Sequence, residues 1–362
     1  MLKTLDRYII KKYLSSFLFT ALVFSLIAVI IDFSQNVEEF IDEKLPAWVV
    51  AKEFYLNFII FINGLLWPLF ALISVIFFTS RMAYNSEIIS MLNAGISFRR
   101  LMRPYMVAAG LIAITHLLLN HFVIPNSNKT RLNFFHTYIY KEGDKGKTRD
   151  VHMFIAPGTK VYVRDYFKSD SMAHNFRLEK IEGNRLAWFV EAQEARWKGP
   201  PDHWELSNYE IHTFDGAKEG IVTGLQQKLD TTIAITPQDF VRYDDTREMI
   251  PSNRLRTFIE EEKLRGTGNT KVYEIELYRR SADPFTILIV TVIGMAVASR
   301  KVKGGMGLHL ALGIGLGAIF IFMAKFSMTI ATNEALPAFA GVWLPNFVFL
   351  LIALILISKA QK

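Results

Sequence analysis

Long apolar runs lie in both halves of the chain, and a polar region separates the first three runs from the last three. A helix needs about 20 residues to cross a hydrocarbon core about 30 Å thick. Five runs satisfy this length, and the shorter fourth run reaches it if its helix begins near residues 279–283. The pattern therefore predicts six transmembrane helices, at 13–31, 54–80, 104–124, 284–299, 304–324 and 335–358.

The polar region has a different pattern. From residue 151 onwards apolar and polar residues alternate, as they do along half-buried strands, and turn residues separate the runs. Strands in series at this spacing predict an antiparallel sandwich or an open barrel, at 151–155, 160–167, 176–181, 185–197, 203–214 and 221–235. Helices are expected at 252–265 and 271–281. The predicted fold class is an α-helical membrane protein with six transmembrane helices and an all-β domain inserted between the third and fourth, with domain limits of 1–124, 125–283 and 284–362.

Lys and Arg are distributed unevenly among the short loops, and cytoplasmic loops carry the excess of these residues. The pattern predicts that both termini are cytoplasmic and that the β domain lies on the other side of the membrane. The net charge of +7 is therefore a signal of topology and does not favour nucleic-acid binding. The basic residues on the predicted cytoplasmic side are Lys3, Arg7, Lys11, Lys12, Arg81, Arg99, Arg100, Arg103, Arg300, Lys301, Lys303, Lys359 and Lys362.

No catalytic or metal site is predicted. The chain contains no cysteine, which excludes disulfides and thiolate metal sites. His116 and Asn120 share a helix face in the third span without a carboxylate, which favours hydrogen bonding over metal binding. Gly146-Lys147-Thr148 lacks the first glycine of a phosphate-binding loop. We therefore predict a non-catalytic protein; a membrane-anchored enzyme acting on the cell envelope is the less favoured alternative.

The loop at residues 81–103 predicts a short amphipathic helix. Asn85 or Ser86 can cap its start, and Gly95 is placed to end it. Ser97 can cap the helix that follows. One face of the short helix carries Ile88, Met91 and Leu92, and Glu87 lies in its first turn. An exposed apolar stripe of this kind suits either a protein partner or the lipid headgroups of the membrane surface.

Two further groups have alternative interpretations. Inward positions of the predicted strands, including Val161, Val163, Trp188 and Trp204, form a core, or a groove for lipid if the β domain is open on one side. Lys325, at the outer end of the fifth span, either reaches the interface or contacts an anionic lipid headgroup. Gly313 and Gly317 have the spacing that lets two membrane helices approach closely.

With three spans, an inserted β domain and three further spans, the chain resembles the LptF/LptG (YjgP/YjgQ) permease family over nearly its whole length. The most specific match is residues 86–97, SEIISMLNAGIS, followed by Arg100-Leu101 and Pro104. Weaker matches are residues 236–240, TPQDF, and Arg279-Arg280 with Pro284 at the start of the fourth span.

The resemblance implies a permease subunit of the lipopolysaccharide-export ABC transporter in the bacterial inner membrane. Residues of about 84–97 would be a coupling helix that contacts an LptB-like ATPase dimer through Glu87, Ile88, Met91, Leu92 and Gly95. ATP and Mg would bind to that partner, and this chain would bind no cofactor. The β domain would be a periplasmic jellyroll that passes lipopolysaccharide to LptC/LptA-like β proteins. The first and fifth spans would line the lipid cavity, facing a second LptF/LptG-type permease.

One stretch departs from the family pattern. Lipopolysaccharide transporters of the family tend to carry basic residues at the outer end of the first span, where this chain has Asp32, Glu38, Glu39, Asp42 and Glu43. Positive charge for a lipid headgroup would then come from Lys44, Lys325 or the partner permease. A permease of the same architecture that exports another envelope lipid or glycolipid therefore remains an alternative.

Overall fold

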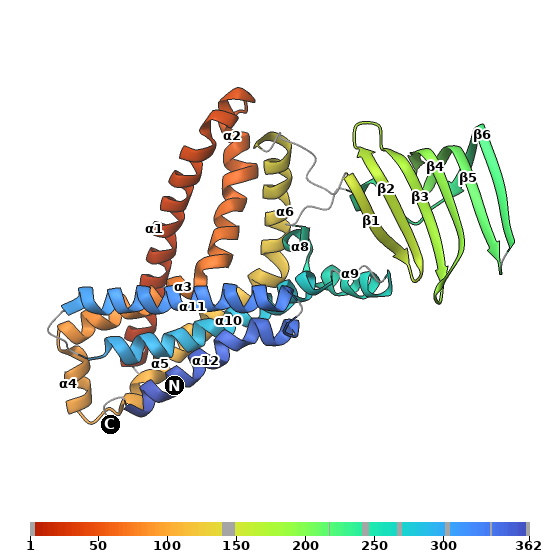
Figure 1. Ribbon diagram of the computed structural model, residues 1–362. Helices are drawn as coiled ribbons and strands as arrows, with labels where there is room; N and C mark the ends of the chain where they lie inside the picture. Colours follow the sequence, from red (N-terminus) through yellow and green to blue (C-terminus); the bar gives the residue numbers. More distant parts are fainter. Residues whose placement is uncertain are drawn as a thin grey trace. The chain divides into compact units, whose positions relative to one another are not determined.

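The computed structural model describes residues 4–139, 149–216, 218–240, 246–265, 270–300, 305–333 and 335–359. The chain divides into two compact units (Figure 1). The helical unit comprises Met1–Tyr140, Glu248–Leu255 and Lys271–Lys362, and the β unit comprises Lys141–Arg247 and Arg256–Thr270. Some residues named above lie outside the described ranges, namely Lys3, Gly146, Lys147, Thr148, Lys301, Lys303 and Lys362.

Six helices within the described residues are long and apolar enough to cross a membrane, as predicted. The second and third spans are continuous helices in which short π-helical segments interrupt the α-helix. In chain order the helical elements are α1 (Thr4–Asp42), α2 (Ala47–Val49), η1 (Val50–Tyr55), α3 (Leu56–Tyr84), α4 (Glu87–Asn93), α5 (Phe98–Leu118), η2 (Leu119–Val123), α6 (Ile124–Phe134), η3 (Phe135–Ile139), α10 (Lys271–Ala298), α11 (Gly305–Thr332) and α12 (Ala338–Lys359).

Helix α10 is the most buried of the six spans, and α11 is the least. The main core of the helical unit joins α1, α3, α5 and α10 through large apolar side chains, among them Tyr13, Phe70, Ile76, Tyr105 and Ile287. The Tyr13 hydroxyl, which is buried, lies 2.6 Å from the Thr291 hydroxyl. The fourth apolar run, the shortest in the sequence, therefore forms the centre of the bundle.

The predicted close approach at Gly313 and Gly317 is confirmed. A Cβ atom added to Gly313 would overlap Ile76 of α3, and one added to Gly317 would lie 2.7 Å from Leu69. Gly315, between them, has no heavy atom within 4 Å of such a Cβ. The two outer glycines therefore let α11 pack directly against α3, because no side chain separates the helices.

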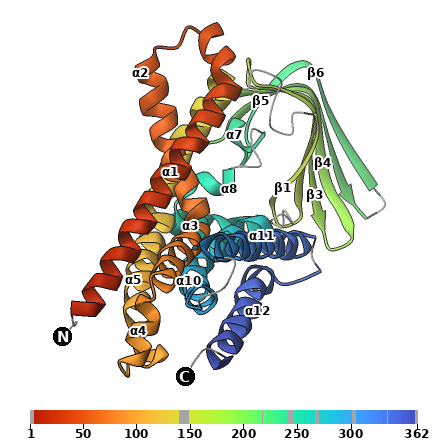
Figure 2. The ribbon, with the colours of Figure 1, turned by 90° about the vertical axis from the view of Figure 1, so that its left-hand side faces the viewer.

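Helix α1 has 39 residues and is about 58 Å long at 1.5 Å per residue. This is nearly twice the hydrocarbon thickness of about 30 Å. Beyond the apolar run, aromatic residues bury one another and hold the end of α1 against η1 and α6. Phe40, Phe54 and Phe134 form this cluster, and Val50 is buried with them. The helical unit therefore extends well beyond the predicted membrane core (Figure 2).

All six predicted strands are present and form one antiparallel sheet, in which each strand pairs with the next in sequence. Of the two arrangements predicted, the described strands form the open one, a single curved sheet (Figure 2). The strands are β1 (Arg149–Ala156), β2 (Thr159–Phe167), β3 (Met172–Glu182), β4 (Arg185–Gly199), β5 (His203–Asp215) and β6 (Lys218–Thr232). Three helices follow: α7 (Pro237–Phe240), α8 (Thr246–Met249) and α9 (Ser252–Arg265).

A row of irregular residues interrupts the alternation in the middle of the sheet. Asn175, Asn208 and Gln226 have φ angles of 50°, 50° and 57°, in the left-handed region that Asn tolerates better than most residues. The Asn208 side chain accepts a hydrogen bond from the backbone N–H of Gln226 at 2.9 Å. Across this row the buried position moves by three residues, from Val163 to Tyr166 along β2. Strict alternation therefore holds on each side of the row but not through it.

Candidate functional site

Helix α4 forms the connection between α3 and α5 at one end of the helical unit (Figure 2). Gly95 ends it with a φ of +83°, as predicted. The N–H of Gly95 bonds to the carbonyl of Leu92 at 2.9 Å, and that of Ile96 bonds to the carbonyl of Met91 at 3.1 Å. These two bonds form a Schellman motif, which satisfies carbonyls that would otherwise lack partners at the helix end.

The residues that flank α4 at its two ends behave differently. Ser97 caps α5 as predicted, because its hydroxyl accepts a hydrogen bond from the N–H of Arg100 at 3.3 Å. Ser86 is the N-cap residue of α4, but it has a left-handed φ of 62° and its side chain makes no capping hydrogen bond. Helix α4 is therefore bounded by two left-handed residues, and its orientation depends on sharp turns at both ends.

The sequence predicts that Ile88 lies on an exposed apolar face of α4, and this prediction is wrong. This side chain is fully buried and belongs to the core shared with Met82, Phe98 and Leu101. Met91 and Leu92 are half-buried and pack against the same core. The physical reason is that the apolar face of a short helix is buried first against the nearest bundle, which here belongs to the same chain. The outer face carries Ile89, which is 37% exposed and which the sequence analysis did not select.

Glu87 lies at the start of α4, half-exposed. Its carboxylate accepts hydrogen bonds from the Tyr8 hydroxyl at 3.1 Å and from the Asn85 side chain at 3.4 Å. Tyr8 belongs to the first turns of α1. The acidic residue predicted to contact a partner is thus hydrogen-bonded to another helix of its own unit.

Replacing Gly95 by alanine is expected to destabilise the end of α4 by about 1–2 kcal/mol, because an L-residue adopts this φ at a steric cost. Faster amide hydrogen exchange over residues 87–96 should report the change. Gly315→Ala is the matched control, since that position has open space for a Cβ and a helical φ. Equal protection of 87–96 in both variants would contradict the role assigned to Gly95.

The second candidate site is the apolar face of the sheet, which the segment after β6 covers. Ile233, Ile235 and Phe240 are buried in one cluster with residues of the sheet. Phe240 stacks on Tyr166 at a centroid distance of 4.1 Å, and the indole N–H of Trp204 donates to the carbonyl of Ile235 at 2.9 Å. Burial raises the pKa of Tyr166, so that its hydroxyl stays neutral. The TPQDF stretch therefore closes part of the β unit's own core.

Three of the four residues predicted to line a lipid path lie in this core. Val161, Val163 and Trp204 are at most 1% exposed in the described structure. A single sheet with one apolar face must bury that face, and the chain does so with its own residues 233–240. Trp188 differs, because it is half-buried and does not belong to the core cluster.

A partly open apolar row remains on the same face of the sheet. The register pairs Val161 with Leu178, Leu178 with Val190, Val190 with Ile211, and Ile211 with Val222. The side chains of directly opposed residues point to the same face. Leu178, Val190 and Ile211 are half-buried, and Val222 is 59% exposed. The row therefore becomes more accessible towards the edge strand β6.

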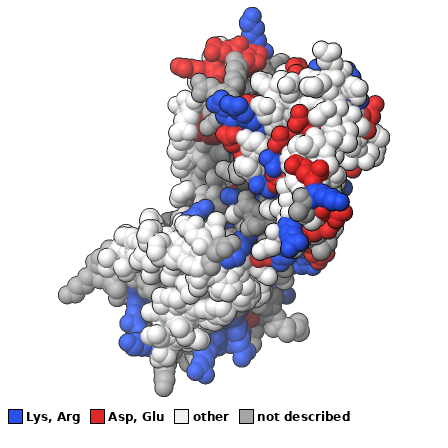
Figure 3. Space-filling view, turned by 45° about the vertical axis from the view of Figure 1, so that its right-hand side comes forward, with Lys and Arg blue, Asp and Glu red and all other residues white. Residues whose placement is uncertain are grey.

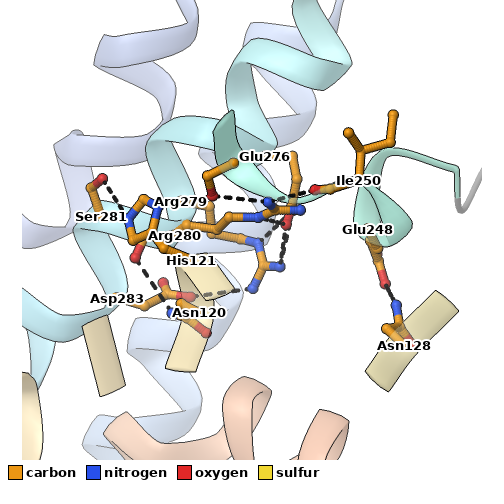
Figure 4. A network of polar contacts seen from close by, with 11 residues as sticks. Asn120, His121, Asn128, Glu248, Ile250, Glu276, Arg279, Arg280, Ser281 and Asp283 are labelled. Atoms are coloured by element: carbon orange, nitrogen blue, oxygen red, sulfur yellow. Dashed lines mark hydrogen bonds and ion pairs between the residues drawn. The ribbon is translucent and has the colours of Figure 1, made fainter. Parts of the chain in front are cut away.

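The third candidate site is a buried polar network around Arg280 in α10 (Figure 4). Arg280 is 2% exposed and pairs with Glu276 at 2.9 Å. It also donates to the Ile250 carbonyl at 2.8 Å and to the Ser252 hydroxyl at 3.1 Å. Arg279 pairs with Glu276 and, at 3.2 Å, with Asp283. These contacts hold the segment 248–255, which lies in the chain between the two parts of the β unit, to the fourth span.

A π-helical segment of the third span completes the Arg280 network. In η2, the side chain of Asn120 donates to the Arg280 carbonyl at 3.4 Å, and a ring nitrogen of His121 lies 2.8 Å from the Ser252 hydroxyl. Pro125 cannot donate to the carbonyl four residues before it, and the wider turn accommodates this defect. His116, which was predicted to share a helix face with Asn120, has a ring nitrogen 2.8 Å from the Gly64 carbonyl oxygen. Among the described residues no group with the composition of a metal site occurs.

Lys44 and Lys325 are both exposed. Lys44 occupies the turn between α1 and α2 with a φ of 51°, and Lys325 lies within α11. Neither lysine has an ion-pair partner within 4.0 Å among the salt bridges of the described residues, so their role as headgroup ligands stays a prediction.

Comparison with protein families gives a match over nearly the whole chain. The model of the lipopolysaccharide export system permease LptF/LptG family matches residues 7–359. Comparison with curated proteins gave no match. The match spans all six apolar helices, α4 and the sheet. Members of this family are transport components of lipopolysaccharide export, and the chain is accordingly a multi-pass membrane protein. The chain belongs to the LptF/LptG family of lipopolysaccharide export permeases.

Proposed function

We propose that this chain is one permease subunit of an ABC transporter that extracts lipopolysaccharide from the bacterial inner membrane. The observation that carries the proposal is the setting of α4. One face of α4 is seated in the bundle core through Ile88, and the other presents Ile89 beside Glu87. A short helix held this way transmits a push from a partner to the bundle. The partner would be an LptB-like ATPase dimer, which binds ATP and Mg, while this chain binds no cofactor and catalyses no reaction.

The distribution of charge supports the proposed orientation. Lys and Arg gather at one end of the helical unit, next to a broad band without charged residues (Figure 3). Arg81, Arg99 and Arg103 belong to this end, which also contains α4. The positive-inside rule makes it cytoplasmic. Both termini and α4 would then face the ATPase, and the β unit would be periplasmic.

The lipid path would begin in the membrane and end on the sheet. The exposed apolar faces of α1 and α11 suit a cavity shared with a second LptF/LptG-type permease, with Lys44 and Lys325 available to phosphate groups. Acyl chains would then meet the open row of Leu178, Val190 and Ile211, with Trp188 beside it. Among the described strands, β6 is an edge strand, with exposed Ile221 and Leu225. An edge of this kind accepts a further strand, as from an LptC/LptA-like β protein.

The coupling proposal is tested on α4. We expect Ile89→Asp and Glu87→Gln to reduce recovery of the ATPase with the tagged chain about tenfold or more. The first adds a charge to an apolar contact and the second removes the negative charge of Glu87, and a tenfold loss corresponds to about 1.4 kcal/mol. Recovery is measured by mass spectrometry of complexes purified from native membranes. Lys11→Gln, an exposed change in α1, is the control. Unchanged recovery with both α4 variants would refute the role of α4.

The same purification tests the cargo. Recovery of the ATPase, a second six-span permease and bound lipopolysaccharide would establish the transporter. Recovery of another glycolipid in its place would favour the alternative cargo, which is motivated by the acidic residues Asp32, Glu38, Glu39, Asp42 and Glu43 at and just beyond the outer end of α1. Recovery of the chain alone in mild detergent would refute the transporter assignment.

A further inference from the structure

We propose that Asp6, Tyr8 and Arg100 are positioning residues that connect α4 to α1, so that movement of α4 tilts the helix proposed to line the lipid path. This inference rests on the proposed function and adds a mechanical route within this chain. The route is assembled from two contacts at the same end of the helical unit. One joins α1 to the start of α5, and the other joins α1 to the start of α4.

The first contact is a bidentate ion pair. The two terminal nitrogens of Arg100 donate to the two carboxylate oxygens of Asp6 at 2.7 and 2.8 Å. Asp6 is 4% exposed, and the side chain of Arg100 is 29% exposed. A paired, planar geometry fixes direction as well as distance, which a single lysine contact would not do. Surface ion pairs are weak and mobile, whereas this pair is largely shielded and joins residues 94 positions apart.

Arg100 is itself fixed to the connection that follows α4. Its backbone N–H is the donor to the capping hydroxyl of Ser97, and the Schellman motif at Gly95 lies directly before. The end of α4, the cap of α5 and the guanidinium that holds α1 are thus within a few residues of one another. The chain between α4 and Arg100 is therefore short, and a hydrogen-bonded turn lies at each of its ends.

The second contact joins α1 to the other end of α4. The hydroxyl of Tyr8 donates to Glu87 at 3.1 Å. Tyr8 and Asp6 are two positions apart on α1, so α1 is held to both ends of the α4 connection. Because Glu87 is also the proposed contact for the ATPase, engagement of the partner would act directly on the Tyr8 bond.

Helix α1 has the composition expected of a straight, stiff helix. Its 39 residues contain neither glycine nor proline, the usual causes of a kink. Ile9, Tyr13 and Phe17 are buried in the core immediately beyond the ion pair. On the other side, Leu18, Leu22, Leu26 and Ile30 are between 54% and 66% exposed. A change of angle at Asp6 therefore moves an exposed apolar face along the whole length of the helix.

The test measures movement of α1 in the complex with its ATPase. The chain has no cysteine, so Gln35→Cys on α1 and Asn333→Cys after α11 give two nitroxide labels on this subunit. The complex with the cysteine-free chain gives the labelling background of the partners. Pulsed electron spin resonance then compares the label distance without nucleotide and with ATP, Mg and vanadate. The measurement is made in four versions of the labelled chain: with native Asp6 and Arg100, with Asp6→Asn, with Arg100→Gln, and with the charges exchanged by Asp6→Arg and Arg100→Asp together.

With the native Asp6–Arg100 ion pair, we expect the distance between the two labels to change when nucleotide binds. The change should be lost in Asp6→Asn and in Arg100→Gln, and it should return in the double variant with exchanged charges. Lipid released per ATP hydrolysed should fall about 2- to 30-fold in the single variants, the range for residues that carry coupling, with the ATPase still bound. Tyr13→Phe is the matched control, because it removes an interhelical hydrogen bond of α1 outside the proposed route. It should retain the distance change.

Three outcomes would overturn the inference. A full distance change in Asp6→Asn or Arg100→Gln would show that the ion pair is not needed. Failure of the exchanged pair to recover, with its ATPase bound, would show that the charges act in another way. Absence of the ATPase from the native complex would instead refute the proposed function itself, and the inference with it.

Discussion

Replacing Arg280 by methionine is expected to lower the stability of the helical unit by about 3–5 kcal/mol. The substitution keeps much of the side-chain volume but leaves a single arginine, Arg279, paired with both Glu276 and Asp283, and buried negative charge that is not fully compensated is costly. Glu276 would keep Arg279, while the Ile250 carbonyl and the Ser252 hydroxyl would each lose a donor. The midpoint of thermal unfolding in detergent, followed by tryptophan fluorescence, measures the loss.

Hydrogen exchange gives this prediction a local readout. Because Arg280 holds Ile250 and Ser252, amides of residues 246–255 should lose protection before the rest of the helical unit does. Lys228→Met is the matched control, since Lys228 is 66% exposed and pairs with Glu205 on the surface of the β unit. A surface pair of this kind contributes about 0–1 kcal/mol. Equal losses in the two variants would mean that the Arg280 network contributes no more than a surface ion pair.

Replacing Trp204 by alanine is expected to destabilise the β unit by about 3–5 kcal/mol, the usual cost of removing a large buried aromatic side chain. Trp204 is 1% exposed, packs against Trp197 and Phe240, and bonds to the carbonyl of Ile235. Its removal leaves a cavity under residues 233–240 and an unpaired carbonyl. Amide exchange over β2 and β4 in the full-length chain should accelerate accordingly.

Two variants separate the causes. Trp204→Phe keeps part of the volume and removes the hydrogen bond, so it should cost less than the alanine variant. Trp188→Ala truncates the same type of side chain on the half-buried part of the same face and should cost clearly less than 3 kcal/mol, because a partly exposed residue leaves no closed cavity. If Trp188→Ala were as destabilising as Trp204→Ala, the division of this face into a closed core and an open row would be wrong.

Local patterns in the sequence were sufficient for the elements of the fold. The apolar runs predicted the six spans because a membrane helix is specified by length and absence of charge alone. Alternation predicted every strand, since each hairpin is closed by nearby turn residues such as Gly183-Asn184. Gly95 and Ser97 were found for the same reason, because a left-handed helix end and a side-chain cap each depend on a single residue type.

Features that depend on distant partners were not predicted. Helical spacing identified the face of α4 that carries Ile88, but only the packed bundle shows that this face points inward. Trp204 is covered by a segment far along the chain, because the carbonyl that accepts its hydrogen bond belongs to Ile235, 31 positions later. The Arg280 network joins residues up to 160 positions apart. Its signal in the sequence was a pair of arginines beside Glu276 and Asp283, charges that are costly near a membrane unless they are paired.

The order of strands in the β unit has a consequence for how the chain assembles. Every pairing in the sheet joins strands that are neighbours in sequence, and contacts of short sequence separation form quickly. The sheet can therefore form as soon as its residues have been synthesised. The Arg280 network forms later, because Arg280 belongs to α10, which is synthesised after the sheet and the helices that follow it. Biogenesis would thus proceed from a completed sheet to a helical unit that closes last around its fourth span.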